Sequence, residues 1–210
     1  MTSGLIKFGK IEGDWSDRPL FIIGGGPSLE GFDFSVLDGR TLGANKSAWV
    51  ADCDFLCSLD QTFVRRAHRE ITEYVASGKG AYLIMPPNER SHEQIPGAAY
   101  AVRIRGKGMS CDPERVHGVN SGYGSLNLGY LMGATSIGLL GFDMNTPGHF
   151  HDGYEWSAPS QAERFYPQWA QQFDTVLPQL NEAGIEVTNY VGPNGSGIKA
   201  FPTKPLETLC

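Results

Sequence analysis

A short histidine-rich segment is the part of this sequence best suited to acid–base chemistry. Residues 148–154 read Gly-His-Phe-His-Asp-Gly-Tyr, so two imidazoles and a carboxylate lie within four residues. If the segment is extended, His149 and His151 point to the same side, because side chains alternate along an extended chain. Histidine is the natural proton acceptor near neutral pH. The segment therefore predicts a catalytic acid and base or a metal site, and the alternative is a surface loop with two incidental histidines.

A glycine-rich loop is the second candidate, and its chemistry would be anion binding. An apolar run of strand length leads into Gly24, Gly25, Gly26, Pro27 and Ser28. A ligand can approach glycines closely because they have no Cβ, and the free N–H groups at a helix start favour phosphate. The loop is not a dinucleotide fingerprint, because its sixth position is Leu29, and it lacks the ending of a Walker A loop. We predict a nucleotide or a phosphorylated donor here, with a tight turn that binds nothing as the alternative.

Single polar residues follow three further apolar runs. Asn45, Asp60 and Asp143 each come directly or almost directly after a predicted strand. Ligands of open α/β sheets bind outside the carboxyl ends of the strands. An asparagine there can bond a ribose or a base edge, and a carboxylate can hold a divalent metal or a ribose hydroxyl. The alternatives are local, because Asn45 and Asp60 could cap the helical turns that follow and Asp143 could be a solvated or capping residue.

The segment Asn120-Ser121-Gly122 opens a predicted helix that is rich in small residues. Hydroxyl and amide groups at a helix N-terminus make a second possible phosphate site. The alternative is structural, because Gly124 and Ser125 would let this helix pack closely against the sheet.

Apolar runs alternate with amphipathic segments along the chain, which indicates a mostly parallel sheet flanked by helices, a single-domain Rossmann-like α/β fold. We expect strands at 20–24, 41–44, 55–58, 81–85, 100–104, 136–142 and 185–189, and helices at 27–37, 62–77, 121–132 and 160–183. The expected organisation is an N-terminal extension (1–18), a nucleotide-binding domain (19–191) and a C-terminal tail (192–210). The long loops 86–97 and 146–159 are typical of functional lids.

Composition narrows the class of protein. The chain has 210 residues, of which 40% are apolar and 19% charged, with a net charge of −6. The acidic balance does not favour nucleic acid as a partner. No apolar run is long enough for a membrane span, and there is no signal-peptide pattern, so we expect a cytoplasmic protein. The four cysteines are expected to be free thiols, because they lack the spacing of a zinc ribbon.

The order of these segments resembles one superfamily. It joins bacterial sialyltransferases of the CMP-sialic-acid type with archaeal-type hydroxymethylpterin pyrophosphokinases. Its members carry a G-x-G-P-S-L loop, an Asn after the second strand, a T/N-S-G helix start and an L-G-x-x-x-I-x-L-x-G-x-D strand. This chain has 24–29, Asn45, 120–122 and 132–143 in that order. The histidine-rich loop and 184–189 look still more like a bacteriophage-encoded branch often labelled "norphogenetic protein". The resemblance covers about residues 19 to 205.

The resemblance implies roles for individual residues. Gly25, Gly26, Pro27 and Ser28 would line the donor's phosphate and ribose. Asn45 would contact the nucleotide, and Ser121 and Gly122 would hold its base or ribose. The sialyltransferases use a histidine as general base and two tyrosines on the leaving phosphate, and His149 or His151 and Tyr154 occupy that region with a different spacing. Relatives of the kinase type are expected to use Mg²⁺, for which Asp60 and Asp143 are the available carboxylates.

Three functions are compatible with this sequence. The leading hypothesis is glycosyltransferase-like transfer from a nucleotide or nucleotide-sugar donor, with His151 as the base that deprotonates an acceptor hydroxyl. The second is Mg²⁺-dependent pyrophosphoryl transfer from ATP, with Asp60 and Asp143 as ligands. The third is a phage protein that binds or sequesters a nucleotide in the cytoplasm of a host cell. The acceptor stays open, and the aromatic loop could serve an interface in a homo-oligomer.

Overall fold

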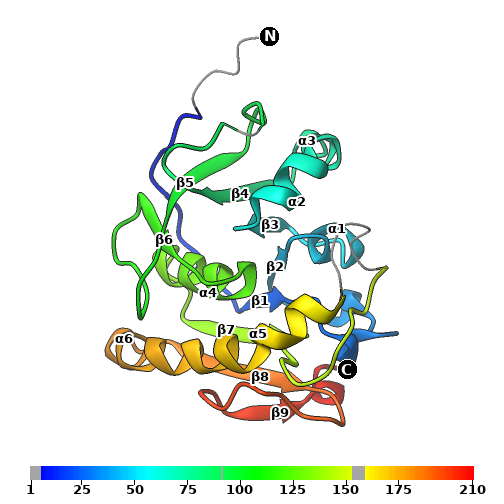
Figure 1. The fold of residues 1–210 in the computed structure, drawn as a ribbon. Helices are drawn as coiled ribbons and strands as arrows, with labels where there is room; N and C mark the ends of the chain where they lie inside the picture. Colours follow the sequence, from blue (N-terminus) through cyan, green and yellow to red (C-terminus); the bar gives the residue numbers. More distant parts are fainter. Residues whose placement is uncertain (1–5, 91, 153–158) are drawn as a thin grey trace.

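The centre of the molecule is one parallel β-sheet (Figure 1). The computed structural model describes residues 6–90, 92–152 and 159–210, and in this part of the chain the sheet has nine strands in the order β6-β5-β4-β3-β2-β1-β7-β8-β9. They are β1 (Leu20–Ile23), β2 (Arg40–Ala44), β3 (Phe55–Ser58), β4 (Gly80–Met85), β5 (Ala99–Ile104), β6 (Arg115–His117), β7 (Ser136–Leu140), β8 (Glu186–Val191) and β9 (Thr203–Pro205). The chain builds outward from β1 to β6 and then returns to the other side of β1, so the strand order switches between β1 and β7.

The predicted fold class is confirmed. Each of the seven predicted strands is present, with ends within two residues of the expected ones. These strands are recognisable because a parallel strand covered on both faces is a nearly continuous apolar run, as in the fully buried β1. The two strands that were not predicted, β6 and β9, are three-residue strands at the edges of the sheet, and β9 lies within the segment 192–210.

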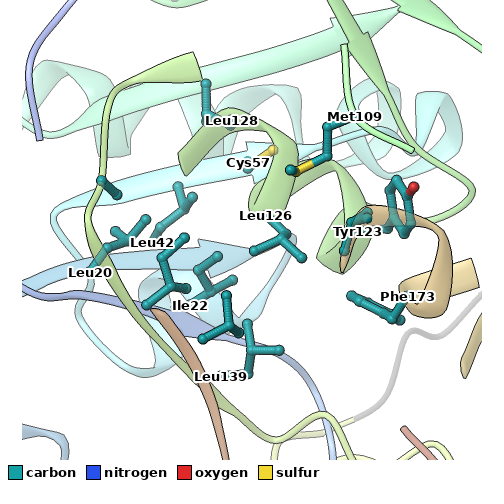
Figure 2. Close-up of a cluster of buried hydrophobic side chains, with 14 of the residues drawn as sticks. Leu20, Ile22, Leu42, Cys57, Met109, Tyr123, Leu126, Leu128, Leu139 and Phe173 are labelled. Atoms are coloured by element: carbon teal, nitrogen blue, oxygen red, sulfur yellow. The ribbon is translucent and has the colours of Figure 1, made fainter. Parts of the chain in front are cut away.

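Helices cover both faces of the sheet. On one face, α4 (Ser121–Leu131), the 3₁₀ turn η3 (Phe173–Val176) and α6 (Leu177–Ala183) pack on the main core. Figure 2 shows Leu20, Ile22, Leu42 and Leu139 of the strands with Leu126 and Tyr123 of α4 and with Phe173. On the other face, α1 (Ser47–Val50), α2 (Gln61–Arg66) and α3 (His68–Ala76) cover a second cluster that includes Leu56, Leu83 and Met85.

The predicted helix 27–37 is wrong, and the reason bears on the glycine loop. This segment forms two 3₁₀ turns, η1 (Pro27–Leu29) and η2 (Phe34–Val36), separated at Gly31, whose φ is +74°. The backbone N–H of Ser28 is bonded to the side chain of Asp143, 115 residues away. No long helix therefore begins at this loop, and the prediction of an anion site at a helix N-terminus loses its structural basis here.

Two other predicted helices are interrupted. The segment 62–77 is divided at Ala67 into α2 and α3. The segment 160–183 is divided into α5 (Pro159–Gln172), η3 and α6, with Pro167 inside α5 and Pro178 in the first turn of α6. Pro178 has no N–H to donate to the preceding turn, which explains the 3₁₀ geometry just before it.

Two further features complete the fold. A short 3₁₀ turn near the C-terminus, η4 (Leu206–Leu209), contributes Leu206 to a third apolar cluster around Phe21 and Ile23. The four cysteines are free, and Cys53 and Cys57 are buried. Among the described helices, none is both long enough and apolar enough to cross a membrane.

Candidate functional site

The glycine loop, Asp143 and the histidine pair gather at the carboxyl ends of β1 and β7, where the strand order switches. Crevices at such switch points are the usual ligand sites of open α/β sheets. The backbone N–H of Gly24 donates to the carbonyl of Leu140 (2.7 Å), and that of Gly26 donates to Gly141 (2.8 Å). The glycine loop therefore continues alongside the chain that leaves β7. Pro27 and Ser28 follow in η1.

Asp143 holds the glycine loop in place. Its carboxylate is nearly fully buried. One oxygen accepts the backbone N–H of Ser28 (2.9 Å) and the other accepts the Ser28 hydroxyl (2.6 Å). A Cβ on Gly26 would lie 2.4 Å from the nearer carboxylate oxygen, so only glycine fits against it. Asp143 is central to the site, and its two oxygens face Ser28.

The histidine-rich loop lies directly on the glycine loop. The carbonyl of Gly25 accepts two hydrogen bonds from it, from His149 Nδ1 (3.2 Å) and from the backbone N–H of Phe150 (3.1 Å). A Cβ on Gly25 would lie 2.7 Å from His149 Nδ1 and 3.7 Å from His151 Nε2. The two imidazole rings are parallel, with centroids 5.1 Å apart. The absence of a side chain at Gly25 therefore makes room for the histidine pair.

Hydrogen bonding fixes which nitrogen of each imidazole can act as a base. His149 Nδ1 contacts the carbonyl of Gly25, and His151 Nδ1 contacts the carbonyl of Asp152 (3.0 Å). Because a carbonyl only accepts, both Nδ1 atoms carry the proton, and in the neutral ring Nε2 keeps the lone pair. The Nε2 atoms are therefore the candidate proton acceptors.

Burial is the main cause that lowers the pKa of both histidines, and the positive charge of Lys46 adds to it. The hydrogen bond to a carbonyl works in the opposite direction in each ring. His149 keeps an exposed outer face, so solvent screens its charge, and the lowering matters most for His151, which is half-buried. A lowered pKa keeps the ring neutral at pH 7, which is the form that a general base needs.

Lys46 contacts the candidate site, and the sequence did not single it out. It follows Asn45 at the end of β2, and its ammonium group donates to the main-chain carbonyl of Asp152 at 2.7 Å. It thereby connects a strand end with the histidine-rich loop. The sequence signal that could have identified Lys46 is its position directly after Asn45, a candidate ligand-binding residue.

Asn45 and Ser121 are brought together. Asn45 has a left-handed backbone (φ 55°), which asparagine tolerates better than most residues. Its side-chain oxygen accepts the Ser121 hydroxyl at 3.0 Å, and the same hydroxyl oxygen accepts the backbone N–H of Leu59 at 3.0 Å. The ends of β2 and β3 are thus joined to the start of α4. The local alternative for Asn45 is not observed, because α1 has no side-chain cap.

Asn120 and Asp60 cap helices. The Asn120 oxygen accepts the N–H of Tyr123 at the start of α4, and Gly122 lies in the first turn of that helix. Asp60 accepts the N–H groups of Thr62 and Phe63 at the start of α2. The local alternative is therefore observed for Asp60.

The two carboxylates expected to hold Mg²⁺ do not fit one ion. Asp60 follows β3 and Asp143 follows β7, and β2 and β1 lie between these strands. Three strand spacings separate the two positions by about 14 Å. Ligands of one Mg²⁺ lie about 2 Å from the metal. In the described ranges, no group of three or more His, Cys, Asp or Glu has an arrangement that could hold a metal ion.

Arg103, on β5, is a second residue that the sequence reasoning missed. Its guanidinium donates to the carbonyls of Leu59 (3.0 Å), Gly118 (3.1 Å) and Val119 (3.3 Å). It thus fixes the end of β3 to the turn that enters α4. Burial is the main cause that lowers the pKa of Arg103. Its partners are main-chain atoms remote in sequence, so no motif indicated them. The last predicted residue, Tyr154, lies outside the described residues.

Two surface hollows lie at the opposite edge of the sheet, near the amino ends of the strands. One, of about 360 Å³, includes Cys111 and Tyr130, and the other, of about 300 Å³, includes Arg18 and Arg40. Neither contains a predicted site residue. At the switch point itself, the histidine pair lies over Gly25, so the candidate site is covered rather than open.

The fold is similar to that of solved glycosyltransferase structures. The MAf glycosyltransferase from Magnetospirillum magneticum AMB-1 superposes with a TM-score of 0.57 at 16% identity over 99% of this chain and 36% of that chain. The chain thus spans about a third of that protein. The sialyltransferase CstII from Campylobacter jejuni, in complex with the substrate analogue CMP-3FNeuAc, superposes with a TM-score of 0.55 at 12% identity over 90% of this chain and 86% of that one.

Comparisons of the sequence with protein families and with curated proteins do not assign the chain to a family. No protein-family model matches the chain, and no curated protein matches it. The structural neighbours agree with the sialyltransferase part of the resemblance at the level of the fold. The pyrophosphokinase and bacteriophage branches of that resemblance stay predictions.

Proposed function

We propose that this protein is a glycosyltransferase-like enzyme that transfers a group from a nucleotide-activated donor to an acceptor hydroxyl. The observation that carries the proposal is the pair of imidazoles held on the backbone of the glycine loop at the switch point. Two glycosyltransferases share the fold, and one of them was solved with a CMP-linked substrate analogue. A nucleotide donor at this edge of the sheet agrees with both observations.

The proposed reaction assigns one role to each element. Nε2 of His151 takes the proton of the acceptor hydroxyl, with His149 as the alternative base. The acceptor oxygen then forms a bond to the donor carbon while the bond from that carbon to the phosphate oxygen breaks. The leaving nucleotide takes the electron pair as an anion. Backbone N–H groups in the first turn of α4 are the candidate donors to this anion, because those of Gly24, Gly26 and Ser28 are bonded within the protein.

Asp143 and Asn45 act as positioning residues in this proposal. Asp143 fixes the glycine loop through Ser28, and Asn45 fixes the start of α4 through Ser121. Both contacts join segments far apart in sequence, so they set the distance between the two walls of the proposed donor site. A transferase needs such preorganisation because a misplaced reacting group raises the barrier steeply.

The pyrophosphokinase alternative receives no support from the geometry, because Asp60 and Asp143 are too far apart to share a Mg²⁺ ion. The non-catalytic alternative is separated from the proposal by turnover. If a bound donor is consumed, the protein is an enzyme.

A ligand panel tests the proposal. Thermal shift with CMP, UDP, ATP and the corresponding sugar nucleotides, each with and without Mg²⁺, sorts the donor class. Stabilisation by CMP- or UDP-linked ligands without metal, followed by release of the nucleotide on incubation, supports the proposal. Stabilisation by ATP only with Mg²⁺ would support the kinase instead. No shift with any nucleotide would overturn both enzymatic hypotheses.

A further inference from the structure

The ammonium group of Lys46 marks a position for the donor's phosphate. We infer that Lys46 is a donor-binding residue, and that it exchanges the carbonyl of Asp152 for a phosphate oxygen when the donor binds. The inference rests on the proposed function and adds to it the residue that recognises the donor's charge. Neither the glycine-loop motif nor the fold assigns this residue a role.

Three observations place Lys46 beside the glycine loop. β1 and β2 are parallel neighbours with Ile23 opposite Gly43, so the residues that follow the two strands lie side by side. Lys46 is three residues beyond Gly43, and the glycine loop begins directly after Ile23. Its ammonium group reaches the histidine-rich loop at Asp152. The same loop rests on the carbonyl of Gly25. Lys46 therefore lies at the border that the glycine loop and the histidine pair share.

Electrostatics agrees with this placement. Burial is the main cause that lowers the pKa of His149 and His151, and the charge of Lys46 adds to it in both rings, so the ammonium group is close enough to act on the histidine pair. A phosphate bound there would offset that charge. The base would then become stronger when the donor is present, which suits a transferase that must not deprotonate an acceptor without its donor.

The contact to Asp152 is exchangeable in chemical terms. A carbonyl is a neutral acceptor, whereas a phosphate oxygen is charged, so the ammonium group gains the attraction of an opposite charge in addition to its hydrogen bond. Lysine acts on phosphate as a flexible point charge with three donors, so it can turn from one acceptor to the other without a change of backbone. The exchange would also release the loop at Asp152, which couples donor binding to movement of the histidine pair.

Calorimetric titration of the protein tests the inference, with CMP and UDP as nucleotide probes and cytidine and uridine as nucleosides. Lys46→Met keeps the aliphatic chain and removes the charge. We expect the Kd for the nucleotide that wild type binds to rise about tenfold or more, with no comparable change for its nucleoside. Lys46→Arg should stay within about threefold of wild type, because it keeps a charged donor.

Lys79→Met is the matched control. Lys79 also donates to a main-chain carbonyl, that of Asp52 at 2.9 Å, and it pairs with the Asp52 carboxylate as well; it lies directly before β4 and therefore at the amino ends of the strands, away from the candidate site. Its nucleotide affinity should equal that of wild type. As a second readout, raising NaCl from about 50 to about 500 mM should weaken nucleotide binding to wild type more than to Lys46→Met, because exposed charge pairs are screened.

The outcomes separate this inference from the proposed function. If wild type binds a nucleotide and Lys46→Met binds it equally well, the inference is wrong and the proposed function stands. An equal loss for nucleotide and nucleoside would also overturn it, because the role would then be structural. If wild type binds none of the probes, both the inference and the proposed function are wrong.

Discussion

Two long polar loops leave the same edge of the sheet, and their length alone predicts a lid for both. The first contains His149 and His151 and follows β7, and the second spans 86–97 and follows β4. The first rests on the backbone of Gly25 at the switch point. The second is built into the core beside α3, with Ile95 fully buried and its N–H bonded to the Tyr100 hydroxyl at 3.0 Å.

The histidines of the two loops show what separates a functional loop from a structural one. His92 is buried, stacks on the Tyr100 ring at 6.1 Å, and its Nδ1 has no hydrogen-bond partner in the structure as described. Burial lowers its pKa, as it does for His151. The direction of the pKa shift is therefore the same in both loops. Position at the switch point and contact with the glycine loop are what distinguish the histidine pair.

Replacing the histidines is the strongest way to test this comparison. His151→Ala should lower kcat by about 10²–10⁴-fold if it is the general base. His92→Phe should leave kcat within about twofold, because the ring is a packing group in the second loop. Turnover of the donor found in the ligand panel measures both effects, and circular dichroism checks the folds. If His151→Ala keeps full activity while His149→Ala loses it, the base is His149. If both keep full activity, the loop is not catalytic.

Substitutions in the second loop should lower the free energy of unfolding more than substitutions in the histidine-rich loop, the reverse of their effects on kcat. Ile95→Ala removes a fully buried side chain from the second loop and should cost about 2–5 kcal/mol of unfolding free energy. Phe150→Ala acts on a half-buried ring that packs 5.5 Å from Phe34, so it should cost clearly less. Urea unfolding followed by fluorescence measures both. Equal losses would mean that the histidine-rich loop is as much a part of the core as the second loop.

Gly25 and Gly26 show the same contrast between a residue needed for activity and a residue needed for stability. Gly26→Ala would place a Cβ 2.7 Å from the carbonyl of Gly141 and closer still to Asp143, so it should destabilise the fold by about 1–3 kcal/mol. Gly25→Ala meets the His149 ring, which belongs to a surface loop and can move. It should leave stability within about 1 kcal/mol and lower kcat, because the ring is displaced. Thermal unfolding and turnover measured on the same preparations decide. A stable, fully active Gly26→Ala would contradict the tight junction with Asp143.

The sequence predicted the sheet well because the central strands are buried on both faces and need continuous apolar residues. It did not predict β6 and β9, whose sequences Arg-Val-His and Thr-Lys-Pro carry little apolar signal and form strands only because a neighbouring strand is present. The expected helix 27–37 is interrupted at Gly31, whose φ of +74° lies between two short 3₁₀ turns.

The site was predictable where the topology determines it. Once the strands are in order, the ends of β1, β2 and β7 must meet, which brings together the regions of Gly25, Asn45 and Asp143. The partners of Lys46 and Arg103 are main-chain carbonyls on distant loops, and a carbonyl has no sequence signature. Whether an aspartate caps a helix or faces a ligand also depends on the structure, as Asp60 shows.

Lowering the pH should change the free energy of unfolding by the smallest amount of these tests, but it separates the roles of the two loops most clearly. Burial lowers the pKa of His151 and His92 in the folded state, whereas in the unfolded chain both have the ordinary value of about 6.5. The unfolded state therefore binds more protons just below pH 6.5. The stability that the neutral rings contribute is complete above that pH and is lost as the pH falls through the folded pKa.

His92→Phe should flatten this loss of stability without moving the acid limb of the pH–activity profile. His151→Ala should flatten the loss of stability less, because His151 is only half-buried. It should also remove activity, and the acid limb of the wild-type pH–activity profile should lie below pH 6.5. Unfolding experiments between about pH 5 and 8 measure how stability depends on pH, and donor turnover over the same range measures how activity depends on it. If His92→Phe shifted the acid limb, the second loop would belong to the site, and the distinction between the two loops would be wrong.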